Sequence, residues 1–316
     1  MNRLEATIGP EDAGRRLGDY MRQPLGCSKR LIRRLKTDPR GIMVNGNRVT
    51  VRYQLAQGDR VSVAQGPTRP LTMPIEDRPL AIAYEDDLVL VVDKPADTPM
   101  YPRFKGDLGA LSGPVLAHLQ AAGGAPGFFP LYRLDRDTTG LVLLAKSAWA
   151  AARLAQKPPE KIYALEAFGR LPAAGSYSLP LAKGAGGLGR IWPVAKGGRE
   201  ACTCYRRVFT SADGLASGAL VYLATGRRHQ IRAHFAQAGH PLLGDPAYGG
   251  PALGHDRPAL HVPYLSFHHP ADGRLVTCFQ PLPMAWSPAW PANYRKEDPY
   301  AHYLTESLCR YPEKIE

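Results

Sequence analysis

The sequence lacks long apolar runs and has few cysteines. Its longest apolar segments, such as 88–92 and 141–145, are far shorter than the ~20 residues that a membrane-spanning helix needs. The N-terminal stretch MNRLEATIGPEDAGRR contains no apolar signal core. The five cysteines are odd in number and include no CxxC pair, which indicates a reducing compartment rather than a disulfide framework. We therefore expect a soluble, cytoplasmic protein that does not bind membranes.

Common cofactor motifs are also missing. The chain has no P-loop and no GxSxG. Gly184, Gly186 and Gly189 match GxGxxG, but Ile-Trp-Pro follows where a dinucleotide fold requires a helix. Seven of the nine histidines fall between 229 and 269, but His229 and His234 are not spaced as in the zinc motif HExxH. We expect no metal ion and no nucleotide or redox cofactor.

What the sequence does contain is a sizeable apolar fraction and an excess of positive charge. Of 316 residues, 44% are hydrophobic, which excludes wholesale disorder, and the 32 glycines and 30 prolines indicate many turns and a β-rich body. The length favours about two domains. Residues 1–70 hold 14 Lys and Arg against 6 Asp and Glu, a net +8 of the total +12. Such a local, one-signed charge favours a nucleic-acid partner.

The basic N-terminal stretch, residues 1–66, has the pattern of a small module. Two short helices are predicted over 14–24 and 28–37, with Ser28 capping the second. Asn45-Gly46 predicts a hairpin turn, and a second strand pair is expected around Gly58-Asp59. The second helix exposes a basic side, which is either a solvated surface or, as we favour, an RNA-binding one: Lys29, Arg30, Arg33, Arg34 and Lys36.

The remainder of the chain predicts one larger domain. A proline-rich linker over 67–79 leads into a region, 80–290, with recurring strand-like runs and few helical windows, mainly 114–121, 147–156 and 229–238. This pattern predicts an α+β fold built on a mixed, mainly antiparallel β-sheet. Residues 291–316 are polar and rich in Pro and Tyr, and are expected to form a peripheral tail.

Two polar clusters stand out within this domain. Asp135 and Asp137 lie in YRLDRDTTG, directly before an apolar strand that would hold a carboxylate rigidly for nucleophilic or acid–base chemistry; a turn cap or solvated carboxylates are equally open. The segment 225–250, TGRRHQIRAHFAQAGHPLLGDPAYGG, concentrates arginine and histidine between glycines. It is either a basic surface helix or, as its many tight turns favour, a shaped site.

These motifs together resemble the RluA-type family of pseudouridine synthases, over about 10–63 and 80–283. YRLDRDTTG is similar to the family's HRLDxxTSG, KIYALEAFG to its K-x-Y strand, and the 225–250 block to GRxHQIRxHxxxxGHPIxGDxxYG. LHVPYLSFHHP and AIAYEDDLVLVVDKPA resemble two further elements, in the family's order. The N-terminal stretch resembles the RNA-binding module of ribosomal small-subunit protein four, through its helix pair and its VNGxxV and Y.L..GD.V.V patterns.

The family resemblance implies roles for matching positions. Asp135 would be the nucleophile that cleaves the uridine glycosidic bond before reattachment through C5. Tyr163 would stack on the uracil, and Arg232 would pair with Asp135 and hold it ionised. Arg133 would fill the RNA stack when the uridine flips out. RNA contacts are further expected from His229, Gln230, Arg227 and Arg228.

Three positions depart from the family pattern. Tyr132 replaces the usual His, Thr139 the usual Ser, and Asp97 stands where the family has Gly. We expect these changes to affect the choice of substrate rather than to abolish catalysis.

The expected activity is isomerisation of uridines to pseudouridine in structured RNA, ribosomal RNA before transfer RNA, by a monomer. The alternatives are a non-enzymatic RNA-binding or ribosome-assembly protein and another glycosidic-bond enzyme, such as a hydrolase.

Overall fold

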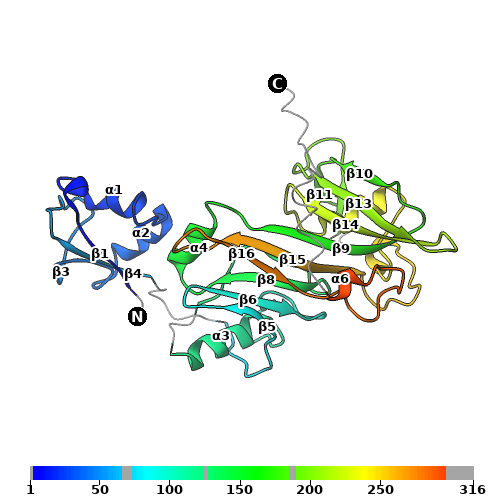
Figure 1. Cartoon of the computed structure of the whole chain (residues 1–316), viewed down its shortest axis with the longest axis horizontal. Helices are drawn as coiled ribbons and strands as arrows, with labels where there is room; N and C mark the ends of the chain where they lie inside the picture. Colours follow the sequence, from blue (N-terminus) through cyan, green and yellow to red (C-terminus); the bar gives the residue numbers. More distant parts are fainter. Residues whose placement is uncertain (1–2, 66–72, 124–126, 185–189, 297–316) are drawn as a thin grey trace.

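A computed structural model describes residues 3–65, 73–123, 127–184 and 190–296. A four-stranded sheet lies near the N-terminus, and a ten-stranded sheet forms most of the remaining chain (Figure 1). A short two-stranded ribbon joins β11 (Leu181–Lys183) to β12 (Ile191–Pro193). No helix in the described ranges is long and apolar enough to span a membrane.

The N-terminal sheet is antiparallel in the order β1-β4-β2-β3. The predicted helices are confirmed in shorter form, as α1 (Leu17–Arg22) and α2 (Lys29–Leu35). The Ser28 hydroxyl caps α2 by accepting from the Leu31 amide at 3.1 Å, and the hairpin turn occurs at Asn45 and Gly46, both at positive φ. The strands are β1 (Arg3–Thr7), β2 (Ile42–Val44), β3 (Asn47–Arg48) and β4 (Arg60–Ala64).

The strand pair predicted around Gly58-Asp59 is wrong on its first side. Residues before the turn form only an isolated bridge between Arg16 and Gln54, and β4 instead pairs with β1, which is not among the predicted strands. The Asp59 carboxylate accepts from the Ala56 amide at 2.8 Å and thereby closes a tight turn there. The backbone of the preceding segment is used by the chain just before α1, since the Leu55 amide donates to the Arg15 carbonyl.

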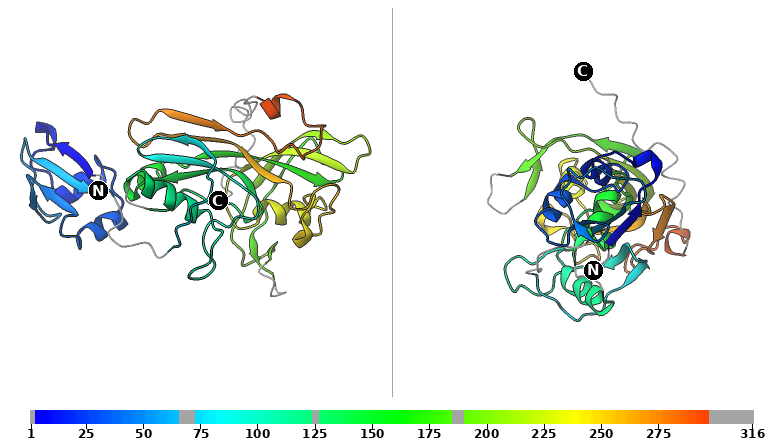
Figure 2. Two further views of the ribbon diagram at one scale, coloured as in Figure 1. Left: turned by 90° about the horizontal axis from the view of Figure 1, so that it is seen from below. Right: turned by 90° about the vertical axis from the view of Figure 1, so that its left-hand side faces the viewer.

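The large sheet has the order β10-β13-β14-β9-β15-β8-β6-β5, with β16 on β15 and β7 on β8 (Figures 1 and 2). Every pairing is antiparallel except that of β15 with β8, which confirms the predicted mixed, mainly antiparallel α+β fold. The strands are β5 (Ile82–Glu85), β6 (Val89–Lys94), β7 (Phe129–Pro130), β8 (Thr139–Ala145), β9 (Glu160–Phe168), β10 (Ala174–Tyr177), β13 (Thr203–Thr210), β14 (Ala216–Leu223), β15 (Leu260–His268) and β16 (Leu275–Phe279).

Helices are few in this sheet domain, as the sequence predicts. The three helical windows correspond to α3 (Ser112–Ala121), α4 (Ala148–Leu154) and α5 (Gln230–Gln237). The Trp149 indole of α4 donates to the carbonyl of Leu25 in the N-terminal module, so the two parts of the chain touch there.

The first residues of the expected C-terminal tail pack against the domain. Trp286, Trp290 and Tyr294 are buried together on the face of the sheet that Ile162 of β9 also lines. Tyr294 lies in the short helix α6 (Asn293–Lys296), and residues 297–316 lie outside the described ranges. The indole of Trp290 donates at 2.8 Å to the buried carboxylate of Glu166. Aromatic burial therefore ties this segment to the domain.

The linker predicted over 67–79 falls partly outside the described residues. Residues 73–79 form neither helix nor strand. They are nevertheless anchored, because the Glu76 carboxylate accepts from the Gly109 amide at 2.9 Å and pairs with Arg78 at 3.2 Å.

Candidate active site

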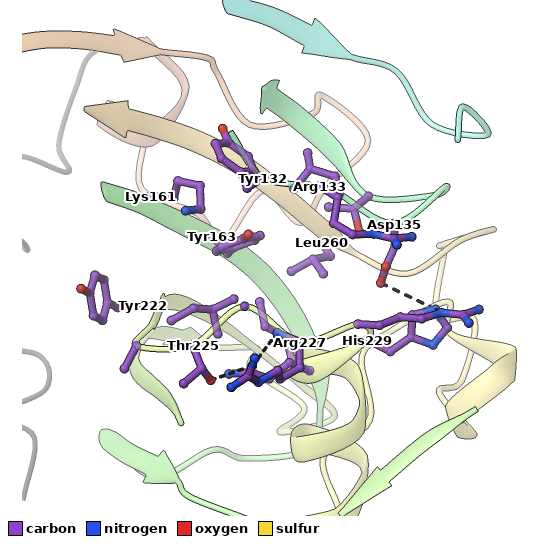
Figure 3. Close-up of a pocket in the computed structure, with 18 of the residues that line it drawn as sticks. Tyr132, Arg133, Asp135, Lys161, Tyr163, Tyr222, Thr225, Arg227, His229 and Leu260 are labelled. Carbon is purple, nitrogen blue, oxygen red and sulfur yellow. Dashed lines mark hydrogen bonds and ion pairs between the residues drawn. The ribbon is translucent and has the colours of Figure 1, made fainter. Parts of the chain in front are cut away.

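A cavity of about 640 Å³ opens beside the loop that precedes β8, and the segment leading into α5 forms another of its walls (Figure 3). β9 contributes Lys161 and Tyr163 to the cavity, and β14 contributes Tyr222 at its end. Two sequence motifs almost a hundred residues apart, containing Asp135 and Arg232, thus meet across one space.

Hydrogen bonds from a buried lysine, Lys94, fix the backbone of the loop that carries Asp135. The Lys94 ammonium is fully buried at the end of β6 and donates to the carbonyl oxygens of Pro95, Thr98 and Arg136, at 2.8 to 2.9 Å. Burial lowers the pKa of Lys94 to about 8, and the nearby carboxylates of Asp137 and Asp135 oppose that shift. The strand β8, which follows the loop, is buried along its whole length. The loop that carries Asp135 is therefore anchored both by Lys94 and by β8.

The predicted pairing of Arg232 with Asp135 is present only as a long contact. The Arg232 Nη1 atom lies 3.8 Å from Oδ2 of Asp135, beyond hydrogen-bond distance. Its Nε and Nη2 atoms instead donate to the two carboxylate oxygens of Asp245, each at 2.7 Å. Asp245 is fully buried, so this bidentate pair orients the guanidinium and leaves Nη1 facing Asp135. The prediction is thus corrected: Asp245, and not Asp135, is the main partner of Arg232.

His229 approaches the same oxygen of Asp135. It precedes α5 with a φ of 53°, a left-handed conformation, and its Nε2 lies 3.9 Å from Oδ2 of Asp135. Burial lowers the pKa of His229, the arginines 232 and 228 lower it further, and Asp135 opposes them. Nδ1 lies 3.0 Å from the hydroxyl of Tyr248. The geometry therefore places a neutral imidazole next to the carboxylate.

Gln230 lines the cavity, as expected, but its side-chain amide is bonded within the protein. Its side chain is buried and its amide is fully engaged within the protein. The carbonyl oxygen accepts from Thr225 Oγ1 and the Arg227 amide, and Nε2 donates to Cys202 O and Thr203 Oγ1, all within 3.0 Å. Gln230 therefore ties the loop before α5 to β13 and shapes the cavity wall.

Tyr163 and Tyr132 both lie in the cavity wall but in different roles. The Tyr163 ring is 7% exposed, and burial together with the charge of Asp135 raises its pKa, which keeps the phenol neutral. Tyr132, one of the departures from the family pattern, turns its hydroxyl to the Leu141 carbonyl at 2.8 Å. Its ring faces the Lys161 ammonium, 4.3 Å from the ring centre.

The remaining predicted residues divide between two places. Arg133 and Arg228 are exposed and line the cavity, and Arg227 lines it while donating to the Glu200 carbonyl at 3.0 Å. The basic residues of α2 are not brought to this cavity. Lys29 and Arg33 instead border a separate hollow of about 420 Å³ on the N-terminal module, while Arg30 is exposed and Arg34 half-buried on the same helix.

Within the described residues, no group of three or more His, Cys, Asp or Glu side chains could hold a metal ion. The two basic side chains that contact Asp135 are held within the protein: Arg232 binds Asp245, and His229 binds the hydroxyl of Tyr248. The arrangement can present one carboxylate, flanked by an arginine, a neutral imidazole and a buried phenol, to a ligand that enters a recessed space.

Several known proteins are similar to this chain. Residues 88–237 match the family model described as RNA pseudouridylate synthase. An uncharacterized RNA pseudouridine synthase of Bacillus subtilis, YjbO, is 35% identical over 83% of this chain and 94% of its own. The chain belongs to the RNA pseudouridine synthases. Ribosomal large subunit pseudouridine synthase D of Vibrio parahaemolyticus is 32% identical to this enzyme over 78% of this chain and 77% of its own.

A solved structure supports the same fold for this synthase. Human RNA Pseudouridylate Synthase Domain Containing 1 aligns with a TM-score of 0.56 and 24% identity, over 76% of this chain and 98% of that one.

Three side chains that build the synthase site are absent from the predicted site: Lys94, Lys161 and Asp245. All three lie inside the motifs that carry the family resemblance, VVDKPA, KIYALEAFG and GHPLLGDPAYG. The motif letters mark these positions, but their partners are distant in the sequence, so only the folded chain shows what each contacts.

Proposed function

We propose that this synthase converts uridines of large-subunit ribosomal RNA to pseudouridine, with Asp135 as the nucleophile acting on a flipped-out nucleotide. The observation that carries the proposal is the carboxylate of Asp135, which faces a recessed cavity and whose Oδ2 lies 3.8 Å from Arg232 and 3.9 Å from His229. The relatives named as ribosomal large subunit enzymes favour the choice of RNA.

In this proposal each wall of the cavity has its own task. Arg232 holds its guanidinium 3.8 Å from the Asp135 carboxylate and attracts it electrostatically. Tyr163 offers a buried ring on which a uracil base stacks. The glycosidic bond of a stacked nucleotide is hidden in the duplex, so the target must flip to reach Asp135. Arg133, which is exposed and lines the cavity, would occupy the space that the base leaves.

The N-terminal module is proposed to dock the RNA. Its hollow between α1, α2 and the 51–52 loop contains Asp19 and is otherwise bordered by cations and a few apolar groups. Such a surface suits the phosphates of a folded RNA, which proteins recognise by shape and charge. The basic residues at this hollow are Arg16, Arg22, Lys29, Arg33, Lys36 and Arg52.

The test incubates the wild type and Asp135→Asn with transcripts of large-subunit ribosomal RNA and of transfer RNA, followed by pseudouridine mapping. Asp213→Asn, in an exposed turn, is the matched control and should retain full activity. We expect product in ribosomal RNA from the wild type and the control alone. Product from Asp135→Asn would overturn the nucleophile, and product only in transfer RNA would overturn the substrate.

The docking proposal has a separate readout. Replacing Lys29 and Arg33 together with Ala should reduce the slope of log affinity against log salt by about 2, since each lost phosphate contact releases about one counterion fewer. An unchanged slope would remove the module from RNA binding.

A further inference from the structure

Lys161 is the cation at the end of the cavity away from Asp135 (Figure 3). It precedes Tyr163 by two residues on β9, so both side chains leave the same face of the strand. Its ammonium is 4.3 Å from the centre of the Tyr132 ring and 3.4 Å from the carbonyl oxygen of Pro159. The cavity thus has a carboxylate at one end, a buried aromatic ring in the middle and an ammonium at the other end.

This ammonium has hydrogen-bonding capacity that the protein does not use. An ammonium carries three N–H donors, and the Pro159 contact is long for a hydrogen bond. Burial alone lowers the pKa of Lys161 to about 8, with no carboxylate among the described residues opposing it. Burying a cation without an anionic partner is unfavourable. Its location in the cavity therefore indicates a ligand that accepts hydrogen bonds.

We propose that Lys161 is a further catalytic residue of this synthase, which donates a hydrogen bond to a carbonyl oxygen of the flipped uracil and stabilises the detached base. This inference rests on the proposed function. A uridine with its sugar at Asp135 and its base over Tyr163 directs the far edge of the base toward Lys161.

The chemistry of the reaction requires such a group. When the C1′–N1 bond breaks, its electron pair stays on the uracil, and the negative charge spreads over N1, O2 and O4. The carboxylate of Asp135 bonds to C1′ as the base departs. The C1′–C5 bond then forms from the electron pair on the uracil while the bond between C1′ and Asp135 breaks and returns its pair to the carboxylate; the proton on C5 is lost, and N1 takes up a proton. A cation beside a carbonyl oxygen stabilises the charge that develops in the first of these steps.

The symmetry of uracil allows one cation to serve throughout. N1 and C5 both adjoin C6, so a half-turn about the line through C6 and N3 exchanges them. The same half-turn exchanges O2 with O4. A fixed donor at the far edge of the ring therefore meets a carbonyl oxygen both before and after the base turns. Lys161 would hold the base in the cavity while it reorients.

The surroundings of Lys161 favour the base over an RNA phosphate as its ligand. Tyr132 and Tyr222 lie near it in the cavity wall, together with two prolines, 158 and 159. Glu160 also lines the cavity, and its carboxylate accepts from the Ser266 hydroxyl at 3.5 Å. This largely nonpolar environment strengthens a charge-assisted hydrogen bond. Phosphates near the cavity entrance meet the exposed side chains of Arg133 and Arg228 instead.

The experiment compares Lys161→Met and Lys161→Arg with the wild type in single-turnover reactions on the ribosomal RNA transcript, with enzyme in excess. Lys157→Met, which removes an exposed charge from the same stretch of chain, is the matched control. We expect Lys161→Met to slow conversion about 10- to 100-fold, the effect of one charged hydrogen bond, with unchanged RNA affinity. Lys161→Arg should recover part of the rate, and the control all of it.

A second arm tests the oxygen itself. A synthetic RNA fragment carries 4-thiouridine at the position that the wild type modifies, because sulfur accepts hydrogen bonds more weakly than oxygen. The thio substitution should slow the wild type and leave Lys161→Met almost unaffected. A thermal melt of each variant confirms that it is folded, and a loss of rate in a folded Lys161→Met supports the proposal.

Two results would overturn it. One is equal conversion rates for folded Lys161→Met and wild type. The other is a weaker RNA affinity with a flatter salt dependence but an unchanged rate, which would make Lys161 a phosphate contact. If the wild type forms no pseudouridine in any transcript, the proposed function fails first, so the two failures are distinguishable.

Discussion

Replacing Asp245 with Asn tests whether the buried pair behind Asp135 organises the site. Asp245 is fully buried, and its two carboxylate oxygens accept from Arg232 at 2.7 Å each. The substitution preserves the shape but leaves the guanidinium without its main counter-charge. Removing one partner of a buried ion pair typically costs about 3–5 kcal/mol. The remaining amide oxygen and Asp135, 3.8 Å away, place the expected loss near the lower end, at about 3 kcal/mol.

For a domain of this size, that loss corresponds to a melting temperature lowered by roughly 6–12 °C. Arg232 is also freed to turn toward Asp135, which would hold the nucleophile in a tighter ion pair and slow the chemical step. Thermal unfolding and single-turnover conversion measure the two effects, with Asp256→Asn, an exposed carboxylate, as the matched control. A shift in melting temperature of 2 °C or less corresponds to a loss of stability of about 1 kcal/mol or less. A variant with so small a shift and an unchanged rate would refute the role of this pair.

Three further substitutions test other parts of the structure. The pKa of Lys94 is near 8 in the folded chain, below its ordinary 10.5, so between pH about 8 and 10.5 the folded chain binds fewer protons than the unfolded chain and the free energy of unfolding rises with pH. Lys94→Met should remove this rise. Urea titrations at both ends of the range measure it, and a pH dependence equal to the wild type's would contradict the prediction. Glu166→Ala should destabilise the fold by about 2–4 kcal/mol, since the buried indole of Trp290 loses its acceptor. The segment around Trp290 should then become sensitive to proteolysis. Resistance to protease equal to the wild type's would show that the contact is dispensable. Asp97→Gly should be neutral or stabilising by up to about 1 kcal/mol in urea unfolding. Glycine relieves the positive φ of 52°, and the exposed ion pair with Arg136 that is lost contributes little. A clear destabilisation would mean that the ion pair anchors the loop.

Local chemistry determined much of this protein. The Ser28 cap and the Asn45-Gly46 turn depend on side chains and backbone within a few residues, so the sequence predicts them correctly. The apolar runs predict most strands of the large sheet, because a strand buried in the sheet is mostly apolar. Pro263 illustrates the limit: it lies within β15, where a break in register between His261 and Tyr264 on the side facing β9 accommodates it.

Only the tertiary structure decided which polar groups meet. The sequence predicts Arg232 near Asp135, but whether its guanidinium binds that carboxylate or Asp245 depends on which one is buried against it. Gln230 lies among predicted RNA ligands, yet its amide is saturated by β13 and by the loop before α5. The proposed role of Lys161 depends on the Tyr132 ring and the Asp135 carboxylate, which come from another part of the chain. Hydrogen-bond partners are selected by proximity and burial, and the fold alone brings distant segments into one space.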